Sequence, residues 1–224
     1  MGRHLLRAPV IERRDDEGLA ASLRARLERG ELPRERLTLA RALGHRPAGL
    51  ALGRTEPTGD ESLDPPEGVG GSLEFWGRRL GRFGPAVMLR AAAAFAREVS
   101  EAAALGAAPE AAALDEGLTV IARFESGARG EEQEPLAQAC ERAARAVARA
   151  ALALPAASAG HAACLTLLPV LRAISDLTGA VGAPDREALG AHYLRALQQA
   201  AAGPVAPERL QAAVRAALLT WALA

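Results

Sequence analysis

The sequence predicts an all-α fold, and three observations support this. Alanine, the residue with the highest helix propensity, fills 54 of the 224 positions. The β-branched residues that favour strands are scarce, with three isoleucines and ten valines. Proline followed by an acid recurs at residues 109–110, 184–185 and 207–208, a pairing typical of helix starts because proline needs no N–H there and an acid favours the positive end of the helix dipole. We therefore expect stacked antiparallel helical hairpins, forming a bundle or a short α-solenoid, after a small N-terminal helical unit.

Residues 1–53 are expected to form this N-terminal helical unit, in which a loose lead-in of residues 1–14 precedes the first helix. Asp15 or Asp16 can cap the free N–H groups where that helix begins, and Gly30 ends it. The spacing of its leucines predicts one apolar face. That inner stripe comprises Leu19, Leu23 and Leu27.

Two more helices are predicted within the same unit. Pro33 suits the first turn of the second helix, and Gly44 can adopt the left-handed conformation that ends it. The inner stripe of the second helix comprises Leu37, Ala40 and Leu43. A short third helix is expected over residues 47–52.

A change in composition separates this unit from the main domain. Residues 54–71 are rich in glycine, proline and acidic residues and contain few apolar ones, so we interpret them as a flexible acidic linker. The main alanine-rich helical domain, residues 72–224, then begins with Ser72 as the cap of a short helix that Gly84 ends.

Six long helices are predicted in the rest of the main domain. The spacing of their starts, about 22 to 30 residues, fits successive antiparallel hairpins with short connections. The expected starts are near residues 85, 109, 131, 161, 184 and 207. In three of these helices the apolar residues recur at steps of three and four, which predicts their buried faces. The predicted stripes are Leu136, Cys140, Ala143, Val147, Ala150 and Leu154; Leu189, Tyr193, Ala196 and Ala200; and Leu210, Val214, Ala217 and Trp221.

Composition argues against several classes of partner and location. The chain has 27 basic and 27 acidic residues, so its net charge gives no attraction to nucleic acid or to an anionic membrane. Two cysteines make no disulfide framework, and the N-terminus lacks the features of a secretion signal, so we expect a cytoplasmic protein. Residues 150–171 are long enough to span a bilayer, but Pro155 and Pro169 interrupt them, and we expect two helix ends joined by a turn.

Cys140, His161 and Cys164 form the most suggestive chemical pattern. His161 and Cys164 are three residues apart and share a helical face, while Cys140 lies on the preceding predicted helix. A thiol and an imidazole can act as nucleophile and base, or bind a soft metal. The other interpretation is that both cysteines fill apolar stripes as small hydrophobic residues. No fourth zinc ligand stands at a suitable spacing, so we predict no catalytic residue, metal or cofactor and keep this cluster as the alternative.

The remaining titratable residues suggest little chemistry. An acid–base role for His192 requires a nearby carboxylate, which the sequence does not identify. Tyr193 is expected to be buried with its hydroxyl reaching an edge, and His45 stands in a predicted turn where solvated histidines are common. The absence of lysine excludes Schiff-base chemistry and a lysine-containing phosphate loop.

The segment from residue 75 to residue 83 combines aromatic residues with three arginines. Aromatic and arginine side chains are the types that anchor protein interfaces, so one interpretation is a protein-binding surface. The other is that the aromatic side chains pack onto the bundle while the arginines stay in water. The candidate interface residues are Phe75, Trp76, Arg78, Arg79 and Arg82.

Two passages resemble a group of uncharacterised, alanine-rich helical proteins of high-GC bacteria. They are residues 27–37, continuing to residues 39–45, and residues 214–223. The helices between residues 85 and 202 also look like those of all-helical immunity proteins of bacterial polymorphic toxin systems. These resemblances imply a helical fold and a role in binding a protein partner, and they supply no catalytic residue.

We therefore expect a non-enzymatic helical protein that binds another protein, in its sharpest form an immunity-like inhibitor of a toxin. The alternative is a small-molecule or metal-dependent activity centred on the cysteines and His161. The identity of the partner, the oligomeric state and the choice between bundle and superhelix stay open.

Overall fold

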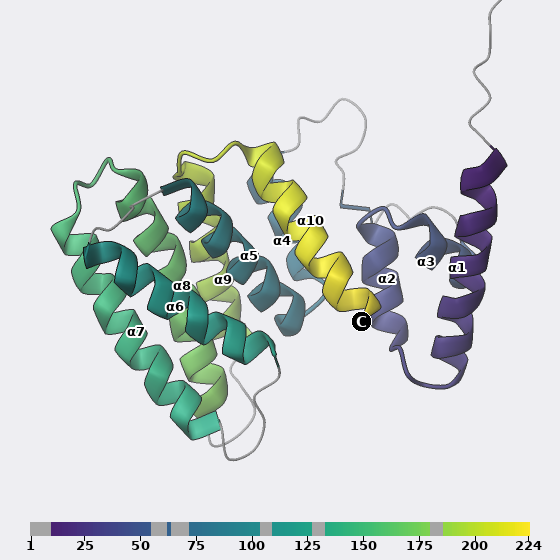
Figure 1. Cartoon of the computed structure of the whole chain (residues 1–224), viewed down its shortest axis with the longest axis horizontal. Coiled ribbons are helices and arrows are strands. Elements are labelled where there is room, and N and C mark those ends of the chain that lie inside the picture. The colour runs from purple at the N-terminus through teal and green to yellow at the C-terminus, as the bar shows by residue number, and fades with distance from the viewer. Residues whose placement is uncertain (1–9, 55–61, 64–71, 104–108, 127–132, 180–185) are drawn as a thin grey trace, which may run out of the picture. The chain divides into compact units, whose positions relative to one another are not determined.

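The computed structural model of this chain describes residues 10–54, 62–63, 72–103, 109–126, 133–179 and 186–224. Within these residues it contains ten helices and no strand, which confirms the predicted all-α fold (Figure 1). The helices are α1 (Val10–Glu28), α2 (Arg34–Ala42), α3 (Arg46–Ala51), α4 (Leu73–Gly81), α5 (Pro85–Ala103), α6 (Pro109–Glu125), α7 (Gln133–Ala153), α8 (Ala159–Gly179), α9 (Arg186–Ala202) and α10 (Pro207–Leu223). Contacts divide the chain into a first unit, residues 1–63 with 219–224, and a second unit, residues 64–218.

Helix α1 of the first unit differs from its prediction in two ways. It begins at Val10 and not at Asp15 or Asp16, because the charged straight-chain residues that precede the two aspartates are good helix formers. Leu19, predicted to face inward, is 47% exposed, whereas Ala20 and Leu23 are buried. Four residues turn a helix by about 40° beyond one full turn, which puts Leu19 at the edge of the buried face.

The second and third helices follow their predictions closely. Gly30 and Gly44 have φ angles of 72° and 89°, in the left-handed region that glycine adopts without steric cost. The predicted inner stripe of α2 is buried, namely Leu37, Ala40 and Leu43. His45 is not the solvated turn residue that we expected, because it is half-buried and its Nδ1 accepts a hydrogen bond from the Ala48 N–H at 3.2 Å. His45 is thus the N-cap of α3.

The boundaries of the two units differ from the predicted domain limits. Most of the predicted linker, residues 54–71, lies outside the described residues, but Leu63 is buried and belongs to the first unit. Residues 219–224 also belong to the first unit, although the sequence places them in the main domain.

Helix α8 lies at the centre of the second unit, where it contacts α5, α6, α7 and α9 (Figure 1). Its neighbours in sequence, α7 and α9, form hairpins with it. Helix α5 is distant in sequence, yet it contacts both α8 and α9. In a superhelical repeat each hairpin contacts only its neighbours, so this unit is a bundle.

The predicted helix starts of the second unit are confirmed to within two residues. Helices α5, α6 and α10 begin at the predicted prolines, while α7, α8 and α9 begin at Gln133, Ala159 and Arg186. The Pro184-Asp185 start signal lies outside the described residues. The expected turn within residues 150–171 is present, since α7 ends at Ala153 before α8 begins. No described helix has the length and apolar character needed to cross a membrane.

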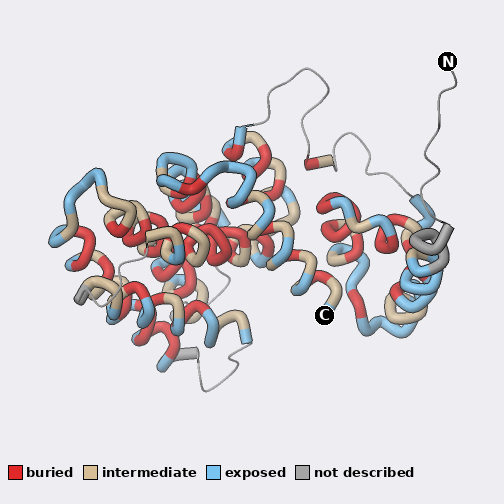
Figure 2. The backbone as a smooth tube through the Cα atoms, turned by 45° about the horizontal axis from the view of Figure 1, so that its top comes forward, coloured by how far each residue is buried: buried red, intermediate tan, exposed pale blue. Residues whose placement is uncertain are grey.

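Buried residues lie along most helices of the second unit (Figure 2), and small residues among them allow close helix contacts. A Cβ atom on Gly77 of α4 would lie 2.5 Å from Leu197 Cδ2, and one on Gly117 of α6 would lie 2.7 Å from Leu167 Cδ2. Tyr193 of α9 is buried, and its hydroxyl donates a 2.7 Å hydrogen bond to the Gly77 carbonyl. We expected this hydroxyl to reach an edge of the fold, but it is buried and bonds to the backbone of α4.

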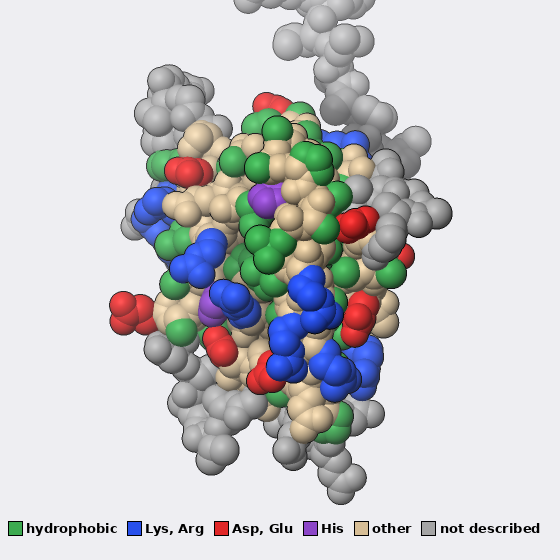
Figure 3. All heavy atoms as spheres, turned by 90° about the vertical axis from the view of Figure 1, so that its left-hand side faces the viewer, with side chains coloured by type: hydrophobic (Ala, Val, Ile, Leu, Met, Phe, Trp, Pro, Cys, Tyr) green, Lys and Arg blue, Asp and Glu red, His purple; other side chains and the backbone are tan. Residues whose placement is uncertain are grey.

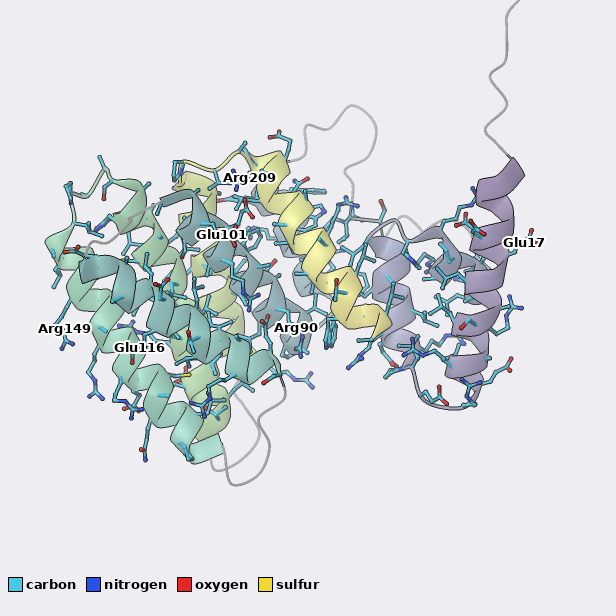
Figure 4. All side chains as sticks on the ribbon, in the orientation of Figure 1. Glu17, Arg90, Glu101, Glu116, Arg149 and Arg209 are labelled. Atoms are coloured by element: carbon cyan, nitrogen blue, oxygen red, sulfur yellow. The ribbon has the colours of Figure 1, made fainter. Side chains whose placement is uncertain are left out.

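The predicted stripe of α10 needs one correction. Its buried residues are Leu210, Val214, Leu218 and Ala222. Trp221 and Ala217 are only partly buried, because steps of four residues continue the buried face through Leu218. At its start α10 is tied to α5 by the ion pair between Arg209 and Glu98, and Arg209 is labelled in Figure 4.

Candidate functional site

The predicted cluster of Cys140, His161 and Cys164 is not brought together by the α7–α8 hairpin. His161 Nδ1 donates a hydrogen bond to the Ala151 carbonyl at 2.9 Å, which fixes the register of the two helices. Cys140 lies eleven residues before Ala151, and Cys164 three residues after His161. At 1.5 Å per residue the two cysteines are separated by about 12 Å along the hairpin axis.

Both cysteines are free and completely buried. Burial raises the pKa of Cys140 to about 12 and that of Cys164 to about 11, because a thiolate is poorly solvated in apolar surroundings. Among the described residues no group of three or more His, Cys, Asp or Glu is placed to hold a metal ion. The structure therefore places the cysteines in the apolar core, and His161 acts with Ser158, whose Oγ accepts from the His161 N–H at 3.1 Å, to close the turn.

The candidate interface on α4 is split between the core and the surface. Trp76 is 2% exposed and lies under the guanidinium of Arg215, 5.8 Å from its ring centre. Phe75 is partly buried, with the Arg79 guanidinium 5.4 Å from its ring centre. Arg78 and Arg82 are exposed. Trp76 thus serves packing, and the side chains of this segment most accessible to a partner are those of Arg78 and Arg82.

An open groove lies between α7 and α8 in the described part of the second unit. Its volume is 310 Å³. Its apolar lining consists of Cys140, Ala144, Ala148 and Leu171. Charged side chains of both signs lie along it, namely Glu141, Arg145, Arg172 and Asp176. Within this set the Arg145 and Glu141 side chains approach to 3.8 Å on α7.

The end of the α7–α8 hairpin next to this groove exposes apolar side chains. Leu152 is 88% exposed. The neighbouring exposed residues of the turn are Ala153, Pro155, Ala156 and Ala157. We call this tip and the groove together the hairpin face. Figure 3, which views the second unit from this side, shows apolar side chains gathered above a group of arginines and acids.

A histidine–carboxylate pair borders the same groove. His192 Nε2 of α9 lies 3.1 Å from Asp176 Oδ2 of α8, and His192 Nδ1 is buried without a hydrogen-bond partner. A carboxylate on one ring nitrogen orients a histidine for proton transfer. However, the cavity that His192 lines has a volume of only 10 Å³, which is space for about one water molecule. The geometry thus provides an oriented histidine without room for an organic substrate.

Asp176 was not identified from the sequence as the partner of His192, because sixteen residues separate the two in the chain. Asp176 and His192 lie eight residues on either side of residue 184, the predicted start of the helix. Pairing the two predicted helices as an antiparallel hairpin places such equidistant residues opposite each other. That signal was present in the sequence.

A second groove, between α6 and α7, has a volume of 400 Å³. It is lined by alanines together with Glu110, Glu116 and Arg149. Figure 4 shows the Arg149 side chain extending outward from α7. This groove has no large apolar side chain in its lining, so it offers a partner less apolar contact than the hairpin face.

Comparisons with protein families, curated proteins and solved structures found no match to this chain.

Proposed function

We propose that this protein works by binding another protein and that the hairpin face holds the partner. One observation carries the proposal: an apolar groove and an apolar tip lie together on one hairpin and are bordered by charges of both signs. An apolar centre with a polar rim is the usual anatomy of a protein interface. Exposed apolar surface of this kind is unfavourable in water unless a partner covers it.

The chemistry of the face defines the partner that fits it. Of its apolar lining, Leu171 and Cys140 are fully buried, so the apolar surface that a partner meets is that of Ala144 and Ala148, which accepts small apolar side chains. The rim carries two arginines and two acids, which suits a segment that also bears both charges. The resemblance to immunity proteins makes a bacterial toxin the sharpest form of this proposal, with the protein acting as its inhibitor.

Affinity purification of the tagged full-length chain from its native host tests the proposal. We expect a stoichiometric partner to co-purify with the wild type. Ala144→Glu together with Leu152→Glu places charges in the groove and at the tip, and should lower partner recovery at least tenfold. Ala201→Glu, a change at an exposed position of α9, is the matched control and should keep it.

Two results would contradict the proposal: no stoichiometric partner under several growth conditions, or equal recovery with the double variant and the wild type. If the partner is a toxin, co-expression of the wild type should relieve its effect on growth, and the double variant should not. If the partner is not toxic, the proposal of protein binding stands and the proposal of a toxin inhibitor is refuted.

A further inference from the structure

The end of α10 is held by two arginines of the first unit. Arg26 of α1 donates one hydrogen bond to the Leu223 carbonyl and one to the Ala224 carbonyl, both at 2.7 Å. Arg36 of α2 donates a 3.4 Å hydrogen bond to the Trp221 carbonyl. These contacts join residues that are more than 180 residues apart in the sequence. We call residues 219–224 the tail, and Arg26 with Arg36 the tail seat.

These contacts satisfy specific needs of a helix end. The last four carbonyls of an α-helix have no partner within the helix, and they carry the negative end of its dipole. Arginine offers several N–H donors in a fixed planar arrangement, so one guanidinium can bond two such carbonyls. In this way Arg26 and Arg36 together cap three backbone carbonyls of the tail.

The seat also recognises one side chain. The Arg36 guanidinium lies 4.6 Å from the centre of the Trp221 ring, within the range of a cation–π interaction. Ala222 beside it is completely buried. The seat therefore caps backbone carbonyls, which any helix end offers. It also selects for an aromatic residue three positions before the last residue of the tail.

We propose that the tail seat is a binding site for the C-terminal turn of a tryptophan-bearing helix, and that it takes the tail of a second copy of this chain when its own tail is absent. The chain's own tail is present at a high effective concentration, so it normally occupies the seat. A second copy carries the same tail and makes the same contacts. This proposal is independent of the hairpin face.

A peptide of residues 207–224 with an N-terminal fluorophore tests the site. Fluorescence anisotropy measures the binding, and we expect it to be saturable for the chain shortened to residues 1–218. Binding to the full-length chain should be at least tenfold weaker, because its own tail competes. In the shortened chain, Arg26→Gln with Arg36→Gln should weaken binding at least tenfold. Arg34→Gln, at an exposed position of α2, should leave it unchanged. A peptide carrying Trp221→Ala should bind more weakly than the parent peptide.

The proposal is overturned if the shortened chain retains the helical circular dichroism of the full-length chain and yet does not bind the peptide, or binds it equally well without the two arginines. If the shortened chain does not fold, hydrogen exchange on the full-length chain decides. The amides of residues 219–224 should exchange at least tenfold faster in the Arg26→Gln, Arg36→Gln variant than in wild type and in Arg34→Gln. Equal exchange in all three proteins overturns the proposal.

Discussion

The contact between Gly117 of α6 and Leu167 of α8 permits a quantitative test of how this bundle packs. A Cβ on Gly117 would lie 2.7 Å from Leu167 Cδ2, whereas ordinary carbon contacts are about 3.5 to 4.0 Å. Both residues are buried, and Leu167 is 0% exposed. The perturbations are Gly117→Ala, Leu167→Ala and the double variant.

The expected energies follow from the overlap. Leu167→Ala should cost about 3 kcal/mol through lost burial and a cavity. Gly117→Ala gains about 1 kcal/mol of helix propensity and loses about 2 kcal/mol by overpacking, a net cost of about 1 kcal/mol. In the double variant the overlap is gone while the propensity gain stays, so the cost is about 2 kcal/mol. The coupling between the two sites is therefore about 2 kcal/mol.

Urea unfolding monitored by circular dichroism measures these free energies. Gly190→Ala is the matched control, because no atom lies within 4 Å of its added Cβ, and it should stabilise the protein by about 0.5 to 1 kcal/mol. Additive effects at Gly117 and Leu167, within about 0.5 kcal/mol, would refute the close approach of α6 and α8.

His45→Ala should cost about 1 kcal/mol of unfolding free energy because it removes the cap of α3. Burial lowers the pKa of His45, so the stability of the wild type should also fall as the pH drops below 6.5. An acid titration of the variant should not show this loss. Tyr193→Phe should cost about 1 kcal/mol in urea unfolding through the lost buried hydrogen bond. Burial raises the pKa of Tyr193, so wild-type stability should fall above pH 10, and the variant should lack that component. Cys140 and Cys164 should react with a thiol reagent at least a hundredfold more slowly in the native than in the unfolded protein; rapid native labelling would argue against their burial.

Features that depend on local chemistry were predictable from the sequence. The helix after Ser72 follows from a cap, since its Oγ accepts from the Phe75 N–H at 3.2 Å. Prolines mark the starts of α5, α6 and α10, and glycines with positive φ mark the ends of α1 and α2. In each case the residue acts on backbone groups within four positions of itself, so the sequence contains both partners.

Features that depend on the choice of a distant partner were not predictable in the same way. Trp221 has the spacing of a core residue, but Arg36 of the first unit covers its ring. The pairing of Asp176 with His192 requires the hairpin register of α8 and α9. For the candidate site, the sequence named aromatic residues and arginines on α4, but packing buries Trp76 there, while the exposed large apolar side chain is Leu152 of α7. Periodicity shows that a face is apolar and does not show which neighbour covers it.

The central position of α8 has a consequence for the order of folding. Its contacts with α7 and α9 close short segments of chain, while its contact with α5 must wait for a long one to close. The two hairpins that α8 forms with α7 and α9 can therefore form early, and α5 packs against them last. Val170 and Ala173 line a cavity together with residues of α5. Substitutions there should mainly speed unfolding, whereas substitutions between α7 and α8 should slow folding itself.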